Sequence, residues 1–249
     1  MIKLKTDQEI EIMIEGGRRL RNTYQELKKN IKPGLTTKTI DTIAETLVKK
    51  AGGEASFKKV KDYYWTTCLS INDQIVHTPP SSRIIEEGDI LTIDIGMYYQ
   101  GYNTDFADSF VVGSTKDKKT LDFLQVGKDT LMKVIKECKI NNHIGDISKV
   151  IENEIYSHGY YVIKQLTGHG IGRELHEDPY VMGFVDKPIK KTALIKNGLT
   201  VAIEIIYSMG TENIKYENDD WSLATDDGSL SACFEHTVAI TNKNTLILT

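Results

Sequence analysis

Four carboxylates stand inside runs of strand-forming residues, at positions Asp94, Asp105, Glu204 and Glu235. Two of them, Asp94 and Glu204, have an isoleucine on each side. A single aspartate of this kind is usually a turn residue or a surface charge, but a carboxylate buried in apolar company without a partner is costly. Four such carboxylates are hard to explain as independent surface charges. The pattern therefore predicts that they face a shared cation.

The first two carboxylates fall on strands that the sequence joins into a hairpin. The turn signal Gln100-Gly101 lies between Asp94 and Asp105, and such dipeptides connect neighbouring antiparallel strands. A two-residue loop there would place both carboxylates on one face of the sheet, either opposite each other or one diagonal step apart. Diagonal neighbours lie about 7 to 8 Å apart at the backbone. The two side chains can therefore share a cation.

A histidine among glycines is the second chemical signal. His169 stands in the segment Gly168–Gly172, which reads Gly-His-Gly-Ile-Gly, and His176 follows seven residues after His169. This spacing matches no helical zinc motif, and a lone histidine is more often structural than a ligand. Three glycines, however, let the backbone approach a ligand closely, which a merely packed histidine does not require. We therefore count His169 among the candidate ligands.

The resulting donor set is rich in oxygen and poor in nitrogen. Four carboxylates and one imidazole could neutralise two divalent ions, and they suit Mn, Fe or Co, or a carboxylate-bound Zn pair, better than thiolate chemistry does. Two metals about 3.5 to 4 Å apart would activate a water molecule and polarise a carbonyl or phosphoryl oxygen. The residues alone therefore predict a dinuclear metallohydrolase and leave phosphoester and peptide bonds both open as substrates.

The elements that must position these residues begin with a pair of helices. Thr6 and Glu9 form a capping-box pattern, which predicts a first helix that stops before Pro33-Gly34. A second helix is predicted from about Thr37, with Gly52-Gly53 ending it. Strands follow this pair, so the carboxylates lie downstream of a helical pair.

The same order of elements then recurs. Helices are predicted near Asp117–Cys138 and Asp146–Ser157, and Gly159 ends the second of them. Strand patterns accompany both helix pairs, at Tyr63–Ile71, Asp89–Met97, Tyr102–Val112, Tyr161–Leu166, Val201–Ile206 and around Glu235. We therefore expect an α+β fold with two similar halves, about 1–115 and 116–249. No Pro/Gly/Ser-rich linker separates the halves, so a single domain 1–249 is expected.

Composition limits the class of protein. The 249 residues include 31 Lys+Arg and 35 Asp+Glu and are 40% hydrophobic, which excludes a disordered or collagen-like chain. No window approaches the roughly 18 apolar residues of a membrane span, and Met1–Ile10 lacks the pattern of a secretory signal. The three cysteines, Cys68, Cys138 and Cys233, follow no disulfide or zinc spacing. A cytoplasmic protein without membrane contact is expected.

Charge is unevenly distributed along the chain. Residues 1–83 carry 15 Lys+Arg and 10 Asp+Glu, a balance of +5, although the whole chain carries −4. A solvated surface explains the basic part best, and weak steering toward a polyanion such as ribosomal RNA is the functional alternative. No RNA-binding motif supports specific nucleic-acid recognition.

Further motifs surround the candidate residues along essentially the whole chain. They are Ser70–Asp73 leading to His77, Gly88–Ile90 leading to Asp94, Gly101-Tyr102 leading to Asp105, Gly168–Gly172 with His176–Pro179, Ile203-Glu204, and Ser229–Thr237. Together they resemble the motifs of type I methionine aminopeptidases. The eukaryotic zinc-binding extension and the insertion of type II enzymes are absent, so the chain is similar to the short bacterial form.

The resemblance implies a fold and a set of metal ligands. The fold would be the pita-bread fold, a curved antiparallel sheet flanked by two helix pairs with pseudo-twofold halves. Asp94 would hold one of two divalent metal ions, and His169 and Glu204 would hold the other. Asp105 and Glu235 would bridge the two ions, which could be Co, Mn, Fe or Zn.

The resemblance also implies a reaction. The enzyme would remove the amino-terminal methionine of nascent polypeptides when the second residue is small, and a monomer is expected. A bridging hydroxide would attack the first peptide bond while Glu204 shuttles protons. His77 would hydrogen-bond the scissile amide, and His176 would contact the peptide and the tetrahedral intermediate. The methionine pocket would be lined by Tyr63, Cys68, Leu175 and Trp221.

Four positions depart from the family's usual residues. They are Thr78 in place of glycine, Leu175 in place of an aromatic residue, Ile205 in place of proline and Cys233 in place of glutamine. None removes a ligand, but they bear on turnover and specificity, so a paralogue with altered specificity is one alternative. A second is an Xaa-Pro peptidase of the same fold, in which an additional amino-terminal domain would be expected before the helix at Thr6. A non-enzymatic binding relative and a dinuclear phosphoesterase are the remaining alternatives.

Overall fold

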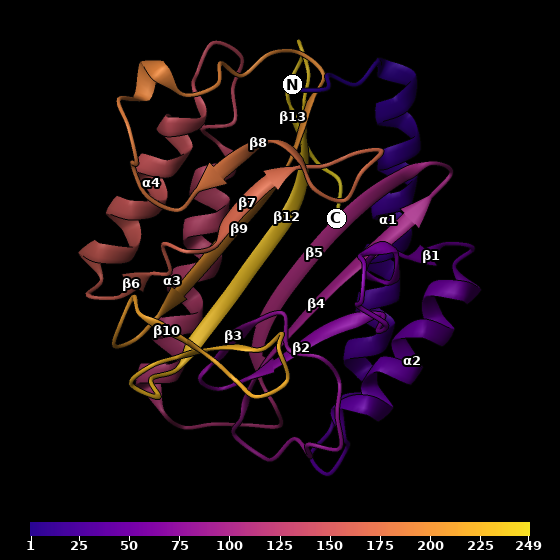
Figure 1. The fold of residues 1–249 in the computed structure, drawn as a ribbon, viewed down its shortest axis with the longest axis vertical. Coiled ribbons are helices and arrows are strands. Elements are labelled where there is room, and N and C mark those ends of the chain that lie inside the picture. Colours follow the sequence, from indigo (N-terminus) through magenta and orange to yellow (C-terminus); the bar gives the residue numbers. More distant parts are fainter.

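Two packed layers, a large sheet and four α-helices, make up most of the computed structural model, which describes residues 1–249 (Figure 1). The helices are α1 (Asp7–Lys29), α2 (Thr37–Lys50), α3 (Lys118–Ile135) and α4 (Ile144–Ser157), with 3-10 turns at Phe57–Lys59 and Ile189–Lys191. The strands are β1 (Glu54–Ala55), β2 (Thr67–Ile71), β3 (Gln74–Val76), β4 (Ile90–Tyr99), β5 (Tyr102–Val111), β6 (Tyr161–Val162), β7 (Thr167–Gly170), β8 (Glu177–Met182), β9 (Leu199–Ser208), β10 (Ile214–Tyr216), β11 (Leu223–Thr225), β12 (Ser231–Ile240) and β13 (Thr245–Ile247).

Helix, helix and strands occur twice in this order, as the sequence predicted. Helix α1 begins at the predicted capping box, in which Thr6 accepts a hydrogen bond from the Glu9 amide and the Glu9 carboxylate accepts one from the Thr6 amide. Helix α4 begins two residues before the predicted start. The His143 amide donates to the Asp146 carboxylate over 2.7 Å. His143 is therefore the N-cap residue, and Asp146, the third residue of the helix, completes the cap.

The sheet has ten strands, all paired antiparallel, along the path β1-β4-β5-β12-β9-β7-β8 with β2, β6 and β13 paired at its sides. Helices α1 and α2 cover one half of it, and α3 and α4 cover the other half (Figure 1). This is the predicted arrangement of an antiparallel sheet flanked by two helix pairs. Strands β5 and β12 lie next to each other where the halves meet.

Each long strand has a helix face and an open face. On β4, Leu91, Ile93, Ile95 and Met97 pack with α1 and α2, and on β9 the odd-numbered residues from Val201 to Tyr207 pack with α3 and α4. Because side chains alternate along a strand, the four strand carboxylates occupy the open face. A small sheet, β10-β11-β3, lies over part of that face. The open face is therefore where a site can form.

The two halves are joined by side-chain hydroxyls as well as by backbone hydrogen bonds. Direct pairing of β5 with β12 is confined to Ala107 opposite Glu235 and the adjacent pair. Beyond it, the Thr237 hydroxyl accepts from the Asp105 amide over 2.8 Å and donates to the Asp105 carbonyl oxygen over 2.9 Å. The hydroxyl stands between the strands and satisfies backbone groups that would otherwise be buried without partners.

A matching bridge lies on the other side of the Ala107 and Glu235 pair. The Ser109 hydroxyl accepts from the Cys233 amide and donates to the Cys233 carbonyl oxygen, each over 2.9 Å. Because Ser109 lies two residues after Ala107 and Thr237 two residues after Glu235, a rotation of half a turn about this pair exchanges the two bridges. The joint between the halves thus has the predicted pseudo-twofold symmetry.

Other predicted boundaries were wrong as well. The strand predicted at Tyr63–Ile71 begins only at Thr67, because the preceding residues form turns around the 3-10 segment. Of the strand predicted at Tyr161–Leu166, only Tyr161–Val162 forms a strand, β6, and the next strand, β7, begins at Thr167, after the predicted end. Helix α3 ends at Ile135, three residues before the predicted Cys138, whose amide bonds back to Ile135 in a tighter turn.

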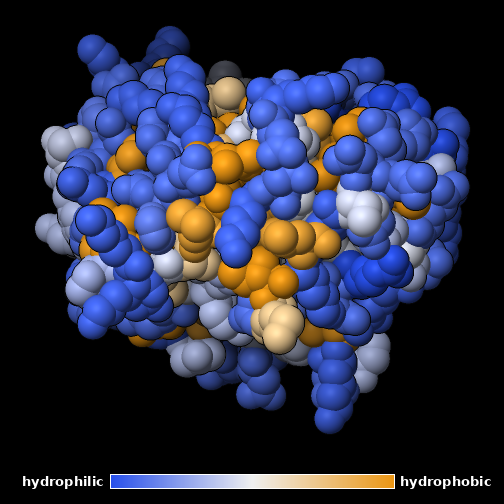
Figure 2. Space-filling view, turned by 90° about the horizontal axis from the view of Figure 1, so that it is seen from above, coloured by the Kyte–Doolittle hydropathy of each residue, from blue (hydrophilic) through white to orange (hydrophobic).

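The amino-terminal segment lies at the upper end of the molecule in Figure 1. Seen from this end, the surface is hydrophilic over both flanks and has a broken apolar area in the middle (Figure 2). The four helices are too short or too polar for any of them to traverse a lipid bilayer.

Candidate metal centre

One row of side chains crosses four strands on the open face. Asp94 on β4 stands opposite Ala107 on β5, and Ala107 stands opposite Glu235 on β12. Glu235 in turn stands opposite Glu204 on β9. Three carboxylates thus lie in one line across the sheet, and the methyl group of Ala107 leaves space between Asp94 and Glu235.

A second row runs beside the first and adds the remaining donors. Asp105 on β5 stands opposite Gly96 on β4, which places it one diagonal step from Asp94, the second of the two arrangements that the sequence left open. His169 on β7 stands opposite Ala202 on β9, two residues before Glu204. Gly96 and Ala202 are small, so the donors of both rows can turn toward one point.

Three donors from different strands converge within a few ångströms. One ligand atom each from Asp105, His169 and Glu235 lies within 4.8 Å of the other two. His169 Nε2 lies 3.5 Å from a Glu204 carboxylate oxygen. His169 Nδ1 lies 2.8 Å from the Gly170 carbonyl oxygen. Donation from Nδ1 to this carbonyl leaves the Nε2 lone pair facing the carboxylates, which is the arrangement of metal-binding histidines.

No positively charged side chain neutralises this cluster of carboxylates. Burial raises the pKa of Asp105 to about 7. Burial and the neighbouring carboxylates also raise the pKa values of Asp94, Glu204 and Glu235. Burial and the nearby His176 ring lower the pKa of His169 to about 4, so this imidazole is neutral at pH 7. No lysine or arginine lines the cavity that contains these groups.

The donor set fits a divalent cation. Glu235 Oε1 is buried without a hydrogen-bond partner, and an unpaired buried carboxylate oxygen is costly unless a cation or donor meets it. Four carboxylates and a neutral imidazole are hard ligands with one borderline nitrogen, which suits Mn, Fe, Co or Zn. The same groups that repel one another without a cation would be neutralised by one.

A cavity of about 190 Å³ opens over the two rows and brings together every residue that the sequence singled out for chemistry or binding. These are His77, Asp94, Asp105, His169, His176, Glu204, Glu235, Tyr63, Cys68, Leu175 and Trp221. A larger groove of about 490 Å³ lies on the helix face between α1 and α3, but none of the three cavity histidines lines it. The chemistry therefore belongs to the smaller cavity.

One wall of the cavity is apolar. The Tyr63 hydroxyl donates to the Thr67 carbonyl oxygen over 2.8 Å, and its ring packs edge-on against Trp221 at 5.0 Å. Sequence analysis missed three further wall residues, Phe57, Val60 and Val76. Phe57 and Val60 precede the predicted strand, in a turn whose course depends on tertiary packing, so no periodic pattern marked them.

Two further imidazoles stand at the cavity mouth. His77 and His176 are exposed, unlike the buried His169, and the His176 ring lies 4.4 Å from that of His169. His77 has a φ of +60°, a left-handed conformation that turns the chain sharply after β3. The turn directs its side chain into the cavity beside the carboxylates.

The departures from the family pattern fall partly outside the cavity. Thr78 is buried, and its hydroxyl accepts a hydrogen bond from Ser70 over 3.1 Å, so its side chain does not line the cavity. Ile205 packs with α3 and α4 on the helix face. Cys233 packs with Val76 in the apolar layer under the small sheet. Of the four, Leu175 alone lines the cavity.

Comparison with known proteins adds independent information. Residues 11–242 match the model of metallopeptidase family M24. Methionine aminopeptidase 1 of Bacillus subtilis is 40% identical over 251 aligned positions, which cover 100% of this chain and 99% of that protein. The crystal structure of methionine aminopeptidase from Thermotoga maritima superposes with a TM-score of 0.95 at 36% identity and covers 100% of this chain and 99% of that one.

A second group of solved structures shares the fold at lower identity. Prolidase from Pyrococcus furiosus superposes with a TM-score of 0.79 at 22% identity, and the match covers 99% of this chain but 65% of that longer chain. At this identity the similarity shows the architecture alone. Both groups confirm the predicted pita-bread fold.

Proposed function

Because the chain belongs to metallopeptidase family M24 and to the methionine aminopeptidases within it, we propose that it removes the amino-terminal methionine from polypeptides whose second residue is small. As a member of this family the chain is a metal-dependent hydrolase. The observation that carries the proposal is one cavity in which carboxylates and imidazoles face an apolar wall. Such a cavity combines a cation site with a pocket for an unbranched thioether side chain.

The proposed centre holds two divalent ions. Asp94 would hold one ion, and His169 with Glu204 would hold the other, because these groups lie at opposite ends of the two rows. Asp105 and Glu235 lie between the ends and would contact both ions. Metal titration of the metal-free protein by calorimetry should give two equivalents per chain.

The reaction requires a nucleophile, a proton carrier and donors to the developing charge. Divalent ions bound there would lower the pKa of a water molecule and polarise the carbonyl of the first peptide bond. Glu204 is partly exposed to the cavity and would take up a proton and pass it to the leaving amine. His77 and His176 would donate N–H groups to the scissile amide and to the tetrahedral intermediate.

The apolar wall would set the preference for methionine. Its side chains form one cluster beside Asp94, whose neighbour on β2 is Cys68, and they comprise Phe57, Val60, Tyr63, Cys68, Leu175 and Trp221. The second side chain of the substrate would have to fit between the centre and the turn that carries His77. A wall that overlaps with large side chains excludes them more sharply than an apolar pocket, which separates similar groups by about 1 to 3 kcal/mol.

The proposal extends to the setting of the reaction. The substrates would be nascent polypeptides in the cytoplasm, with transient contact between the basic residues of the first half and the ribosome. The proposed ligands come from both halves, 1–115 and 116–249, so the chain would act as a single metallopeptidase domain. It would do so as a monomer.

Cleavage assays on four substrate classes test the proposed activity. Purified protein loaded with Mn, Fe or Co should release methionine from Met-Gly, Met-Ala and Met-Ser peptides and should fail on Met-Lys and Met-Leu. It should leave Xaa-Pro peptides and phosphoesters intact. Cleavage of Xaa-Pro peptides at a comparable rate would favour the prolidase activity instead.

A further inference from the structure

The loop that carries His176 is held by residues that do not themselves line the cavity. This loop, Ile171–His176, connects β7 to β8 and ends with the imidazole that lies beside His169. Its position decides where that imidazole points. The contacts of the loop therefore bear on the reaction even where they do not touch the substrate.

A buried ion pair fixes the carboxyl end of the loop. Lys5 Nζ lies 2.5 Å from Glu177 Oε2, and the two side chains are 4% and 2% exposed. The other carboxylate oxygen of Glu177 accepts a hydrogen bond from the Glu174 amide within the loop. Glu177 directly follows His176, so the ion pair fixes the backbone next to the imidazole.

Lys5 is itself anchored and closely packed. Its amide donates to the Gly198 carbonyl oxygen over 2.7 Å, and its ammonium group donates to the Lys3 carbonyl oxygen over 2.9 Å. A Cβ added at Gly172 would lie 2.2 Å from the Lys5 Cε atom. The Lys5 stem thus lies directly on the loop backbone. Burial lowers the pKa of Lys5, and Glu177 opposes that change.

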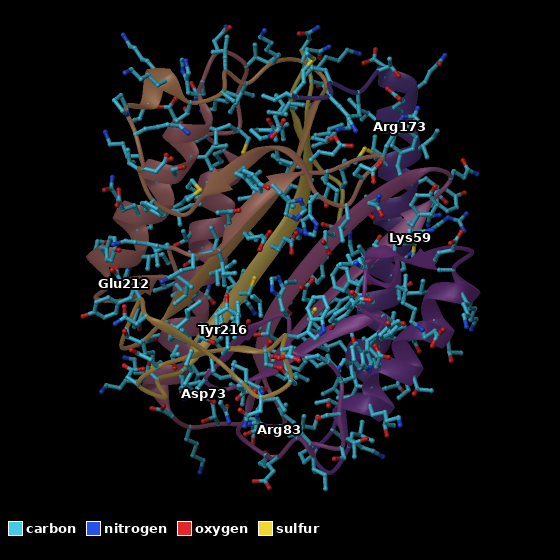
Figure 3. All side chains as sticks on the ribbon, in the orientation of Figure 1. Lys59, Asp73, Arg83, Arg173, Glu212 and Tyr216 are labelled. Carbon is cyan, nitrogen blue, oxygen red and sulfur yellow. The ribbon has the colours of Figure 1, made fainter.

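Other contacts hold the amino end of the loop. The backbone N–H of Asn103 donates to the Gly172 carbonyl oxygen over 2.7 Å. The side-chain amide of Asn103 donates to the carbonyl oxygens of Gly172 and Arg173. Arg173 reaches Glu9 on α1 at 2.9 Å, and Figure 3 shows Arg173 at the upper part of that helix. The loop is therefore held at both ends, and Lys5 supplies its buried charged contact.

We propose that Lys5 is a positioning residue, whose ion pair with Glu177 holds the loop so that His176 faces the reacting peptide bond. The inference rests on the proposed function, in which His176 contacts the substrate. Buried ion pairs contribute little net stability compared with apolar residues, but they require a defined geometry. Lys5 would thus act on the reaction only through His176.

A double-mutant cycle tests this route. Lys5→Met should lower kcat by about 10-fold or more, since small displacements of catalytic groups have effects of this size. In a His176→Ala background the same substitution should change kcat less than twofold. Equal losses in both backgrounds, or no loss in the parent protein, would refute the proposal. Lys3→Met is the matched control, because Lys3 lies in the same segment with an exposed side chain and should leave kcat unchanged.

A second variant separates positioning from stability. Lys5→Met/Glu177→Met removes both charges and leaves none unpaired, so its melting temperature should exceed that of Lys5→Met. Its kcat should stay as low as that of Lys5→Met, because the ion pair is still absent. Recovery of kcat together with the melting temperature would show that Lys5 matters through stability alone.

Hydrogen exchange gives a readout that needs no activity. In metal-free protein, Lys5→Met should speed amide exchange across residues 172–178, whereas Lys3→Met should not. Unchanged exchange would contradict the positioning role even if methionine removal is established. If Lys5→Met speeds exchange but the parent protein cleaves no methionine peptide, the proposed function is refuted and the role of Lys5 in holding the loop still stands.

Discussion

Each half of the molecule carries two carboxylates on a pair of long strands, but the two halves arrange these carboxylates differently. In the first half, β4 and β5 carry Asp94 and Asp105 one diagonal step apart. In the second half, β9 and β12 carry Glu204 and Glu235 directly opposite each other. The shorter side chains are offset and the longer ones are aligned, so the backbones correspond while the donors reach different points.

The joint between the halves is symmetric, but the site built on it is not. Hydroxyls of Ser109 and Thr237 bridge β5 and β12 in equivalent ways. Between them, the half-turn that exchanges the bridges places Ala107 where the second half has Glu235. A second carboxylate at Ala107 would add charge and fill the space that Asp94 and Glu235 share. The repeated strands therefore provide the scaffold, whereas the set of donors depends on the position at which the halves differ, Ala107 in the first and Glu235 in the second.

Removing the carboxylate of Glu235, at the position where the two halves differ, should reduce activity at least as much as any other change considered. Glu235→Ala should lower metal content and reduce activity by roughly 10³-fold or more, because a metal centre supplies several kcal/mol of transition-state stabilisation. Elemental analysis beside steady-state kinetics measures both. Full metal occupancy with normal turnover would show that Glu235 is not a ligand. Asp105→Ala should behave in the same way.

A variant of Glu204, which stands opposite Glu235, should distinguish the loss of proton transfer from the loss of metal binding. Glu204→Gln should lose about 100-fold in turnover, since an amide cannot take up the proton. Metal content should fall less than in Glu235→Ala, because an amide oxygen can still ligate. A pH profile of kcat checks the assignment, and near-normal rates across the pH range would exclude it.

The raised pKa of Asp105 predicts that the stability of the metal-free protein depends on pH. Its pKa is raised to about 7 from a usual value of 3.8, so the folded state binds a proton that the unfolded state releases. Stability from this group is therefore present at low pH and is lost as pH rises from about 4 to 7. Asp105→Asn should gain stability relative to the parent protein over that range, by at most about 4 kcal/mol at 1.36 kcal/mol per unit.

Chemical denaturation of both metal-free proteins at pH 4, 5.5 and 7 would measure this difference. The comparison of variant with parent cancels the opposite contribution of the buried histidines. A difference that stays constant with pH would show that Asp105 is ionised throughout.

The symmetric joint predicts equal structural effects and unequal functional ones. Thr237→Val and Ser109→Ala each leave a backbone amide and carbonyl without their bridge, so each should lower unfolding free energy by about 1–3 kcal/mol. Thr237 bridges the backbone of Asp105 itself, so only Thr237→Val should also reduce metal affinity. Denaturation curves and metal titration of both variants decide this. Equal losses of metal affinity would mean that the joint acts on the centre from both sides.

The smallest effect is expected at the turn that follows His77. Thr78→Gly should change relative rates on a Met-Xaa-Gly series less than twofold, because Thr78 bonds Ser70 and does not line the cavity. The specificity constants for Xaa = Gly, Ala, Ser and Thr give the comparison. A broadened profile would show that Thr78 shapes the second-residue site after all.

Local patterns predicted much of this molecule correctly. The capping box at Thr6, the turn at Gln100-Gly101 and the alternation along β4 each depend on residues within a few positions of one another. These signals were sufficient for the two helix pairs and for the face on which Asp94 and Asp105 lie, but they left open whether the two carboxylates stand opposite each other or one diagonal step apart.

Tertiary structure decided what lies between distant segments. The alignment of Glu204 with Glu235, the closeness of His169 to Asp105 and the bridges of Ser109 and Thr237 depend on strands that pair across long stretches of chain. Register between such strands follows from packing of the helix faces and leaves no local signature.

The sequence by itself determined the residue types, the helix and strand periods and the motif spacing, because these depend on local hydrogen bonding and on which side chains a strand can bury. Only the tertiary structure decided the line of carboxylates around Ala107, the wall completed by Phe57 and Val60, and the ion pair of Lys5 with Glu177. These contacts join segments that meet only when the sheet closes, since their position is set by the packing of the whole core and not by neighbours along the chain.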